Sequence, residues 1–245
     1  MRCSFGIFQN YGRVNEGALI VDFNIDKWLN TYTEAVQRQF GNRVWFIGLQ
    51  GSYGRGEATS TSDIDVVLIL DTLSMQDLKL YSKLLDTLPN REMVCGFVSG
   101  KTEIEAWEKS DLFQFCNDTT PIIGSLAHLM NEISEADIKR AIRIGVCNIY
   151  HACVHNLLHE KNLDMLKSLY KSAAFTCQAI AYLQDGIFEK KQANLSQYLM
   201  PEDRLVIETR LSLNSVDELS EDEFTRLTDM LIKWASSWIQ KVNYE

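Results

Sequence analysis

The sequence has few prolines, no closely paired cysteines and no long apolar segment. Only three prolines occur, so long helices are possible, above all after Pro121. The six cysteines form no C-x-x-C pair, and this usage is typical of reduced thiols in a cytosolic protein. No run of 18 apolar residues is present, so we expect no membrane span. Residues 1–10 lack a charged-then-apolar secretory pattern, and we therefore expect a cytoplasmic protein.

Basic residues are also scarce relative to acidic ones. The formal net charge is -9, which argues against broad, non-specific nucleic-acid binding because that activity needs a face that neutralises phosphates. An acidic chain is better matched to a cationic or neutral partner. The hydrophobic fraction of 46% is that of a folded globular protein, and 245 residues suit one large domain or two small ones.

The N-terminal half alternates between helical and strand patterns. Residues 24–40 carry apolar side chains at three- and four-residue spacing, with Asn24 as N-cap and Gly41 as C-terminal stop. The segments that follow predict strand, polar glycine-rich turn, strand, helix and strand at 43–49, 50–62, 63–70, 74–87 and 92–99. This order indicates a small sheet flanked by helices.

The C-terminal half shows only helical patterns. Ser134 marks a helix start, and the predicted helices cover residues 134–160, 163–185, 202–211 and 220–242. We therefore expect an α+β protein with two domains, residues 1–125 and residues 126–245, the second an all-helical bundle. Trp107, Asp111 and Asp118 lie near the boundary and are candidates for lining an acceptor pocket there.

Two aspartates at the start of an apolar strand carry the strongest chemical signal. Asp63 and Asp65 are two residues apart, so in a strand both side chains point to one face. Two adjacent carboxylates repel each other unless a cation lies between them. Magnesium is the expected ion, because it prefers oxygen ligands and takes one or two carboxylates together with substrate phosphates.

The glycine-rich turn before these aspartates is suited to a triphosphate. Gly51 lets backbone N–H groups approach a ligand closely, the Ser52 hydroxyl adds a donor, and Arg55 can add a charge-assisted contact. The turn is not a Walker A loop, since no G-K-[ST] follows. The turn and the aspartates together predict one site for a nucleoside triphosphate and magnesium.

The segment G-S-Y-G-R-G-E-A-T-S-T-S-D-I-D-V-V-L, residues 51–68, resembles the signature of the nucleotidyltransferase superfamily that includes DNA polymerase beta. The resemblance implies a mixed sheet of three or four strands and a triphosphate held by the turn, with Ser52 on the phosphates. It also implies that Asp63 and Asp65 bind magnesium. Residues 1–125 would then be the catalytic domain.

Residues 175–191, F-T-C-Q-A-I-A-Y-L-Q-D-G-I-F-E-K-K, are similar to the helical domain of streptomycin- and spectinomycin-type adenylyltransferases. This resemblance implies a helix that ends in a glycine and a lysine shortly after it that reaches the triphosphate. Lys191 matches that lysine best, with Lys190 beside it. Gln178 or Ala179 stands where the resemblance implies an arginine. Residues 126–245 would shape the acceptor pocket.

The resemblance to the nucleotidyltransferase superfamily also implies a third carboxylate on the next strand, as a metal ligand or as general base toward the acceptor hydroxyl. Glu92 is the only acid in that strand, and we assign it this role. An alternative alignment places Gly96 at the acidic position. Glu103, Glu105 and Asp111 are the remaining acids nearby.

These features predict a magnesium-dependent nucleotidyltransferase that moves a nucleoside monophosphate, AMP from ATP, to a hydroxyl of a small acceptor. An aminoglycoside-like cation agrees with the acidity of the chain. Two alternatives stay open: an enzyme of the same class that acts on a protein or an RNA, as an antitoxin would, and a nucleotide-binding module without turnover.

Overall fold

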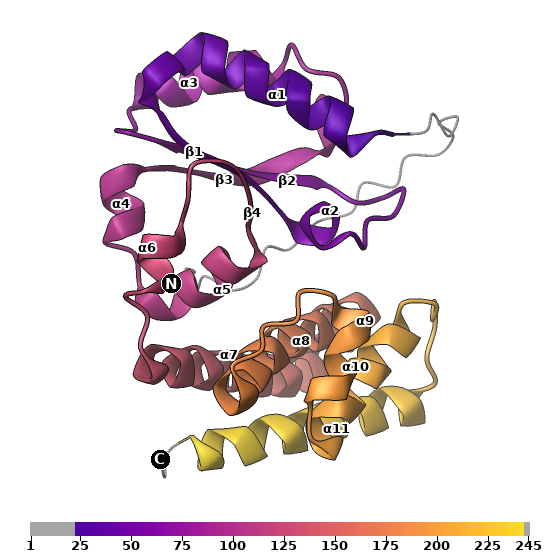
Figure 1. Ribbon diagram of the computed structural model, residues 1–245. Coiled ribbons are helices and arrows are strands. Elements are labelled where there is room, and N and C mark those ends of the chain that lie inside the picture. The colour runs from indigo at the N-terminus through magenta and orange to yellow at the C-terminus, as the bar shows by residue number, and fades with distance from the viewer. Residues whose placement is uncertain (1–22, 243–245) are drawn as a thin grey trace. The chain divides into compact units, whose positions relative to one another are not determined.

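The computed structural model describes residues 23–242, which group into two compact units (Figure 1). An α/β unit contains residues 23–108 and 115–132, and a helical unit contains residues 109–114 and 133–242. The expectation for residues 1–10 lies outside the described residues.

A four-stranded mixed sheet forms the centre of the α/β unit. Its order is β3-β2-β1-β4. β1 (Val44–Gln50) is antiparallel to β2 (Ile64–Leu70) and to β4 (Thr120–Ile123), whereas β2 is parallel to β3 (Val94–Gly100). The predicted α+β class is therefore confirmed.

Two helices cover one face of this sheet, α1 (Ile25–Phe40) and α3 (Met75–Leu85) (Figure 1). Their apolar sides pack on alternate residues of β1 and β2 in one buried cluster, which includes Trp28, Tyr32, Val36, Phe40, Ile47, Leu49, Ile64, Val66, Leu68 and Leu70. α1 begins and ends as predicted: the Asn24 side chain accepts the Lys27 N–H at 2.9 Å, and Gly41 follows the last turn with φ +56°.

Short elements connect the strands of the α/β unit. The predicted glycine-rich turn begins with a one-turn helix, α2 (Gly51–Arg55), which Gly56 ends in the left-handed conformation. The other short elements are the 3₁₀ turns Gly41–Arg43 and Arg91–Met93 and the helices α4 (Lys101–Glu105), α5 (Lys109–Asp118) and α6 (Ala127–Met130). Residues 109–114 of α5 group with the helical unit.

The helical unit is built on long helices with strong N-terminal caps. α7 (Glu135–His155) begins in a reciprocal capping box at Ser134, and α11 (Glu221–Lys241) in one at Ser220. Between them lie α8 (Leu163–Asp185), α9 (Gln192–Leu195), the 3₁₀ turn Ser196–Tyr198 and α10 (Pro201–Leu213). α7 gives way to a π turn, Asn156–Glu160, inside the segment predicted as one helix.

That π turn is stabilised by the side chain of Asn156, which is fully buried. Its amide donates to the Asn162 carbonyl and accepts from the Asn162 N–H, each at 3.0 Å. In the described part of the chain, no helix combines the length and the apolar character that crossing a membrane requires.

Candidate active site

The two aspartates lie on the sheet face opposite to α1 and α3. Ile64, Val66 and Leu68 of β2 are buried under those helices, so the intervening Asp65 points to the other face. Asp63 lies two residues earlier, directly before the strand, and both carboxylates are half-buried. Burial raises the pKa of the Cys95 thiol, and the negative charges of Asp65 and Asp63 raise it further. Both aspartates therefore lie near the beginning of β2, beside the beginning of the parallel strand β3.

Gly51 is in direct contact with Asp65. Its φ is +66°, and a Cβ atom at this position would lie 1.9 Å from Asp65 Oδ2. Any side chain at residue 51 would have to displace the carboxylate. The glycine is therefore required by geometry: it lets the first turn of α2, with Ser52 next in sequence, lie against the aspartate.

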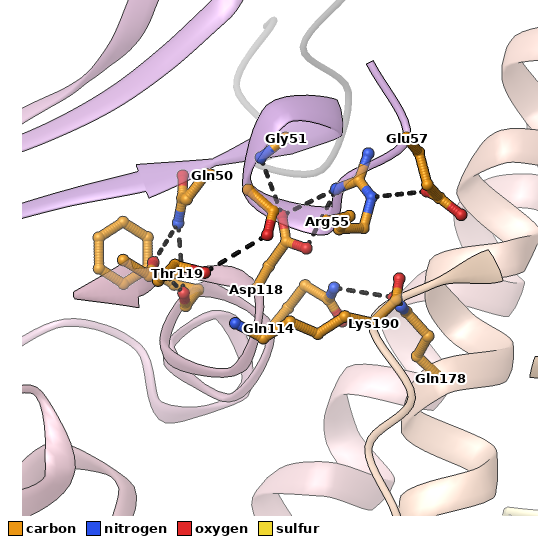
Figure 2. A network of polar contacts seen from close by, with 12 residues as sticks. Gln50, Gly51, Arg55, Glu57, Gln114, Asp118, Thr119, Gln178 and Lys190 are labelled. Carbon is orange, nitrogen blue, oxygen red and sulfur yellow. Dashed lines mark hydrogen bonds and ion pairs between the residues drawn. The ribbon is translucent and has the colours of Figure 1, made fainter. Parts of the chain in front are cut away.

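Asp118, at the end of α5, supports this turn from another direction (Figure 2). Its carboxylate accepts from the Gly51 N–H at 3.4 Å, and both of its oxygens lie 3.0 Å from Arg55 Nη1. Arg55 Nε donates to Glu57 at 3.2 Å, and only 7% of Arg55 is exposed. The guanidinium thus fixes α2 through two carboxylates. The contact of Arg55 with phosphate, expected from the sequence, stays a prediction.

This role of Asp118 was not predicted. The sequence did offer a signal, because an acidic residue is unfavourable at the negative C-terminal end of a helix dipole unless a cation or N–H group compensates it. Arg55 and the Gly51 N–H are those groups, and they lie more than 60 residues away in sequence.

One row of side chains crosses three strands beside the aspartates. Gln50 of β1 pairs with Asp65, which pairs with Cys95 of β3. Gln50 Nε2 donates to Thr119 Oγ1 at 2.7 Å and to the Phe115 carbonyl at 3.2 Å, so this end of β1 is tied to the end of α5 (Figure 2). The residue beside Asp65 on the neighbouring parallel strand is therefore a thiol and not a carboxylate.

Glu92 lies outside β3, in the 3₁₀ turn Arg91–Met93, and is exposed. β2 and β3 are parallel, so Glu92 and Asp63 both precede their strands at the same end of the sheet. Gly96 has φ +139°, and a Cβ there would lie 1.9 Å from the Val66 carbonyl oxygen. The backbone thus requires glycine at 96, which leaves no room for a carboxylate at that position.

The site fits magnesium through its donor chemistry. Asp63 and Asp65 provide hard carboxylate oxygens on one face, next to a turn suited to phosphate. Within residues 23–242, no three His, Cys, Asp or Glu side chains are grouped so as to hold a metal ion. A magnesium ion would therefore take its remaining ligands from phosphate oxygens and water, as this ion commonly does. Of the other acids, Glu103 and Glu105 are exposed on α4 and Asp111 lies in the helical unit.

The second predicted nucleotide contact belongs to the helical unit. α8 ends at Gly186 in the left-handed conformation, with φ +69°, as the resemblance implied. Lys191 follows as the N-cap residue of α9 and is exposed, while its backbone N–H donates to Glu189 Oε1 at 2.8 Å. Its contact with a triphosphate stays a prediction.

Comparison with known proteins agrees with this architecture. Residues 29–112 match the family model described as "Nucleotidyltransferase domain", and this segment includes β1, β2, β3 and the three predicted carboxylates. Residues 29–112 are therefore similar to nucleotidyltransferase domains, and this similarity supports an enzyme of the nucleotidyltransferase class. No curated protein matches the chain.

A solved structure shares this fold. A spectinomycin adenyltransferase, AAD(9), from Enterococcus faecialis, solved with ATP and spectinomycin, is 14% identical with a TM-score of 0.57. The match covers 87% of this chain and all (100%) of that one, so the fold likeness extends over both units. A nucleotidyltransferase-like protein from Exiguobacterium sibiricum 255-15 is 11% identical with a TM-score of 0.34, over 88% of this chain and 75% of that one.

Proposed function

We propose that the protein is a magnesium-dependent adenylyltransferase that transfers AMP from ATP to a hydroxyl group of a small, aminoglycoside-like acceptor. The observation that carries the proposal is the packing of Gly51 against Asp65, since it joins a turn suited to phosphate with a carboxylate suited to magnesium. The similarity of residues 29–112 to nucleotidyltransferase domains supports nucleotidyl transfer itself.

In this proposal, each half of the chain has its own role. Residues 1–125 form the catalytic domain, in which Gly51, Ser52 and Arg55 hold the triphosphate and Asp63 and Asp65 hold magnesium. Residues 126–245 shape the acceptor pocket, and Lys191 contacts the triphosphate.

The reaction is an in-line displacement. The acceptor hydroxyl oxygen attacks the α-phosphorus of ATP, a new P–O bond forms, and pyrophosphate leaves. Bound magnesium supplies neutralisation of the phosphate charge. Glu92 takes the hydroxyl proton, and its exposure before β3 leaves it accessible to an acceptor.

Two observations support a small cationic acceptor. The net charge of -9 attracts cations and disfavours polyanions. The fold resembles that of an enzyme solved with spectinomycin. The cytoplasm is the proposed location, where ATP is available.

The test is pyrophosphate release from ATP and magnesium across a panel of aminoglycosides and related antibiotics, with the product identified by mass spectrometry. The proposal requires release that depends on one acceptor, together with an acceptor that gains one AMP. Release without any modified acceptor would count against it.

One observation favours a second candidate, a nucleotide-binding protein without turnover. Cys95 occupies the position beside Asp65 on β3, and Glu92 lies outside that strand. Calorimetry separates the two candidates: ATP binding with no release for any acceptor would support the second.

A further inference from the structure

The segment between α8 and α9 carries the proposed triphosphate lysine, and its backbone is fixed at several points. We call residues 186–191 the lysine loop. The Gly186 N–H donates to the Tyr182 carbonyl at 2.8 Å, which closes the end of α8. The Phe188 ring lies edge-on to Phe113, with ring centroids 5.7 Å apart. The first half of the loop is thus held by a helix cap and an aromatic contact.

The second half of the loop is held by one buried amide, Gln178 (Figure 2). This residue of α8 is completely inaccessible to solvent. Its Nε2 donates to the Glu189 carbonyl at 2.8 Å and to the Lys190 carbonyl at 3.1 Å. Both N–H donors of the amide therefore bond to consecutive carbonyls directly before Lys191.

The other end of the same amide is fixed too. Gln178 Oε1 accepts from Gln114 Nε2 at 3.1 Å, and Gln114 belongs to the part of α5 that groups with the helical unit. This bond sets the orientation of the amide, so its nitrogen faces the loop. A glutamine whose donors and acceptor are all engaged is specific: no other residue type of this shape supplies two donors and an acceptor.

We propose that Gln178 is a positioning residue for nucleotide binding: it holds the lysine loop in place so that Lys191 meets the triphosphate of ATP without first being ordered. The inference rests on the proposed function. Binding to a loop that is already ordered avoids the entropic cost of fixing it, and this appears as tighter ATP binding. Gln178 touches the loop backbone and not the reacting atoms, so its loss should raise the KM for ATP more than it lowers kcat.

The experiment compares Gln178→Leu with wild type and with a matched control, Gln184→Leu. Leucine keeps the approximate size of the side chain but cannot donate to the two carbonyls. Gln184 lies on the same helix, is exposed, and receives the same substitution. Limited trypsin digestion reports on the loop, since trypsin cleaves after Lys190 and Lys191. The KM and kcat for ATP report on function.

Because each hydrogen bond contributes modestly, Gln178→Leu should speed cleavage at the loop roughly 5- to 30-fold and raise the KM for ATP by a similar factor. Gln184→Leu should match wild type in both. Magnesium and ATP should protect the loop from trypsin in wild type. A second variant, Gln114→Ala, leaves Gln178 in place and should give smaller changes in the same direction, so the test survives if Gln178→Leu fails to fold.

The outcomes separate the two claims. If wild type turns over ATP and both Gln178→Leu and Gln114→Ala leave cleavage and KM unchanged, the role of Gln178 is wrong and the proposed function stands. If the variants loosen the loop but wild type neither binds ATP nor shows protection, the proposed function fails and the positioning role fails with it. A fall in kcat at unchanged KM would also overturn the positioning role.

Discussion

Replacing Gly51 by alanine tests the contact on which the proposed site depends. The new Cβ would lie 1.9 Å from Asp65 Oδ2, a separation that two non-bonded atoms cannot adopt. Either the carboxylate or the first turn of α2 must move by more than 1 Å, taking ordinary contact as about 3.5 Å. We therefore expect Gly51→Ala to abolish magnesium-dependent turnover of ATP and to weaken Mn²⁺ binding followed by electron paramagnetic resonance.

The substitution also carries a backbone cost that has to be separated from the steric one. Alanine at positive φ costs about 1–2 kcal/mol, and in a chain of this size each kcal/mol lowers Tm by about 2–4 °C. Gly41→Ala is the matched control, because Gly41 has φ +56° but nothing lies within 4 Å of its Cβ position. Both variants should lose several degrees in Tm, whereas only Gly51→Ala should lose activity and Mn²⁺ affinity. A Gly51→Ala protein that keeps both would refute the proposed contact between the turn and the metal site.

The remaining predictions concern a base, an ion pair and a buried acid. Glu92→Gln should lower kcat about 100-fold or more at unchanged ATP affinity, if a general base is lost; unchanged kcat in a pyrophosphate assay would remove Glu92 from the mechanism. Asp118→Ala leaves the buried Arg55 guanidinium without this partner, so it should cost about 3 kcal/mol in urea unfolding and raise the KM for ATP; an unchanged unfolding midpoint would contradict this. Asp203 accepts both tryptophan indole N–H groups of α11 on Oδ1, at 2.7 and 2.6 Å, so Asp203→Ala should cost about 1–3 kcal/mol while Asp203→Asn keeps the acceptor. Burial raises the pKa of the Asp203 carboxyl in the folded protein. The contribution of Asp203 to stability therefore falls as pH rises from the pKa of the unfolded state, about 3.9, to the raised pKa of the folded state. Over this pH range the Tm of Asp203→Asn should rise relative to that of wild type, and a Tm difference independent of pH would contradict this.

Features set by neighbours in sequence could be predicted. The caps at Asn24, Gly41 and Ser134 involve residues within one helical turn, and the structure confirms them. The direction of the Asp65 side chain could be predicted as well, because side chains alternate between the two faces of a strand. The other face of β2 packs under two helices, so Asp65 points away from them.

Features set by distant contacts could not be predicted. β4 has only four residues and contains Pro121, so it shows no strand pattern; it is an edge strand because β1 offers it a partner. The approach of Gly51 to Asp65 and the pairing of Asp118 with Arg55 are also invisible in local sequence, because each joins residues brought together only by folding. The role of Gln178 could not be predicted either. The resemblance implied an arginine near this position, whereas the structure shows a glutamine that donates two hydrogen bonds to the backbone of the lysine loop.

In the proposed function, Asp63 and Asp65 support transfer of the α-phosphoryl group of ATP. To test this, an acceptor and ATP labelled at either the α- or the γ-phosphate are given to wild type and to the Asp63→Asn/Asp65→Asn variant. We expect wild type to transfer only the α label, this transfer to need magnesium, and the variant to transfer none. Transfer of the γ label, or α-label transfer that persists in the variant, would contradict it.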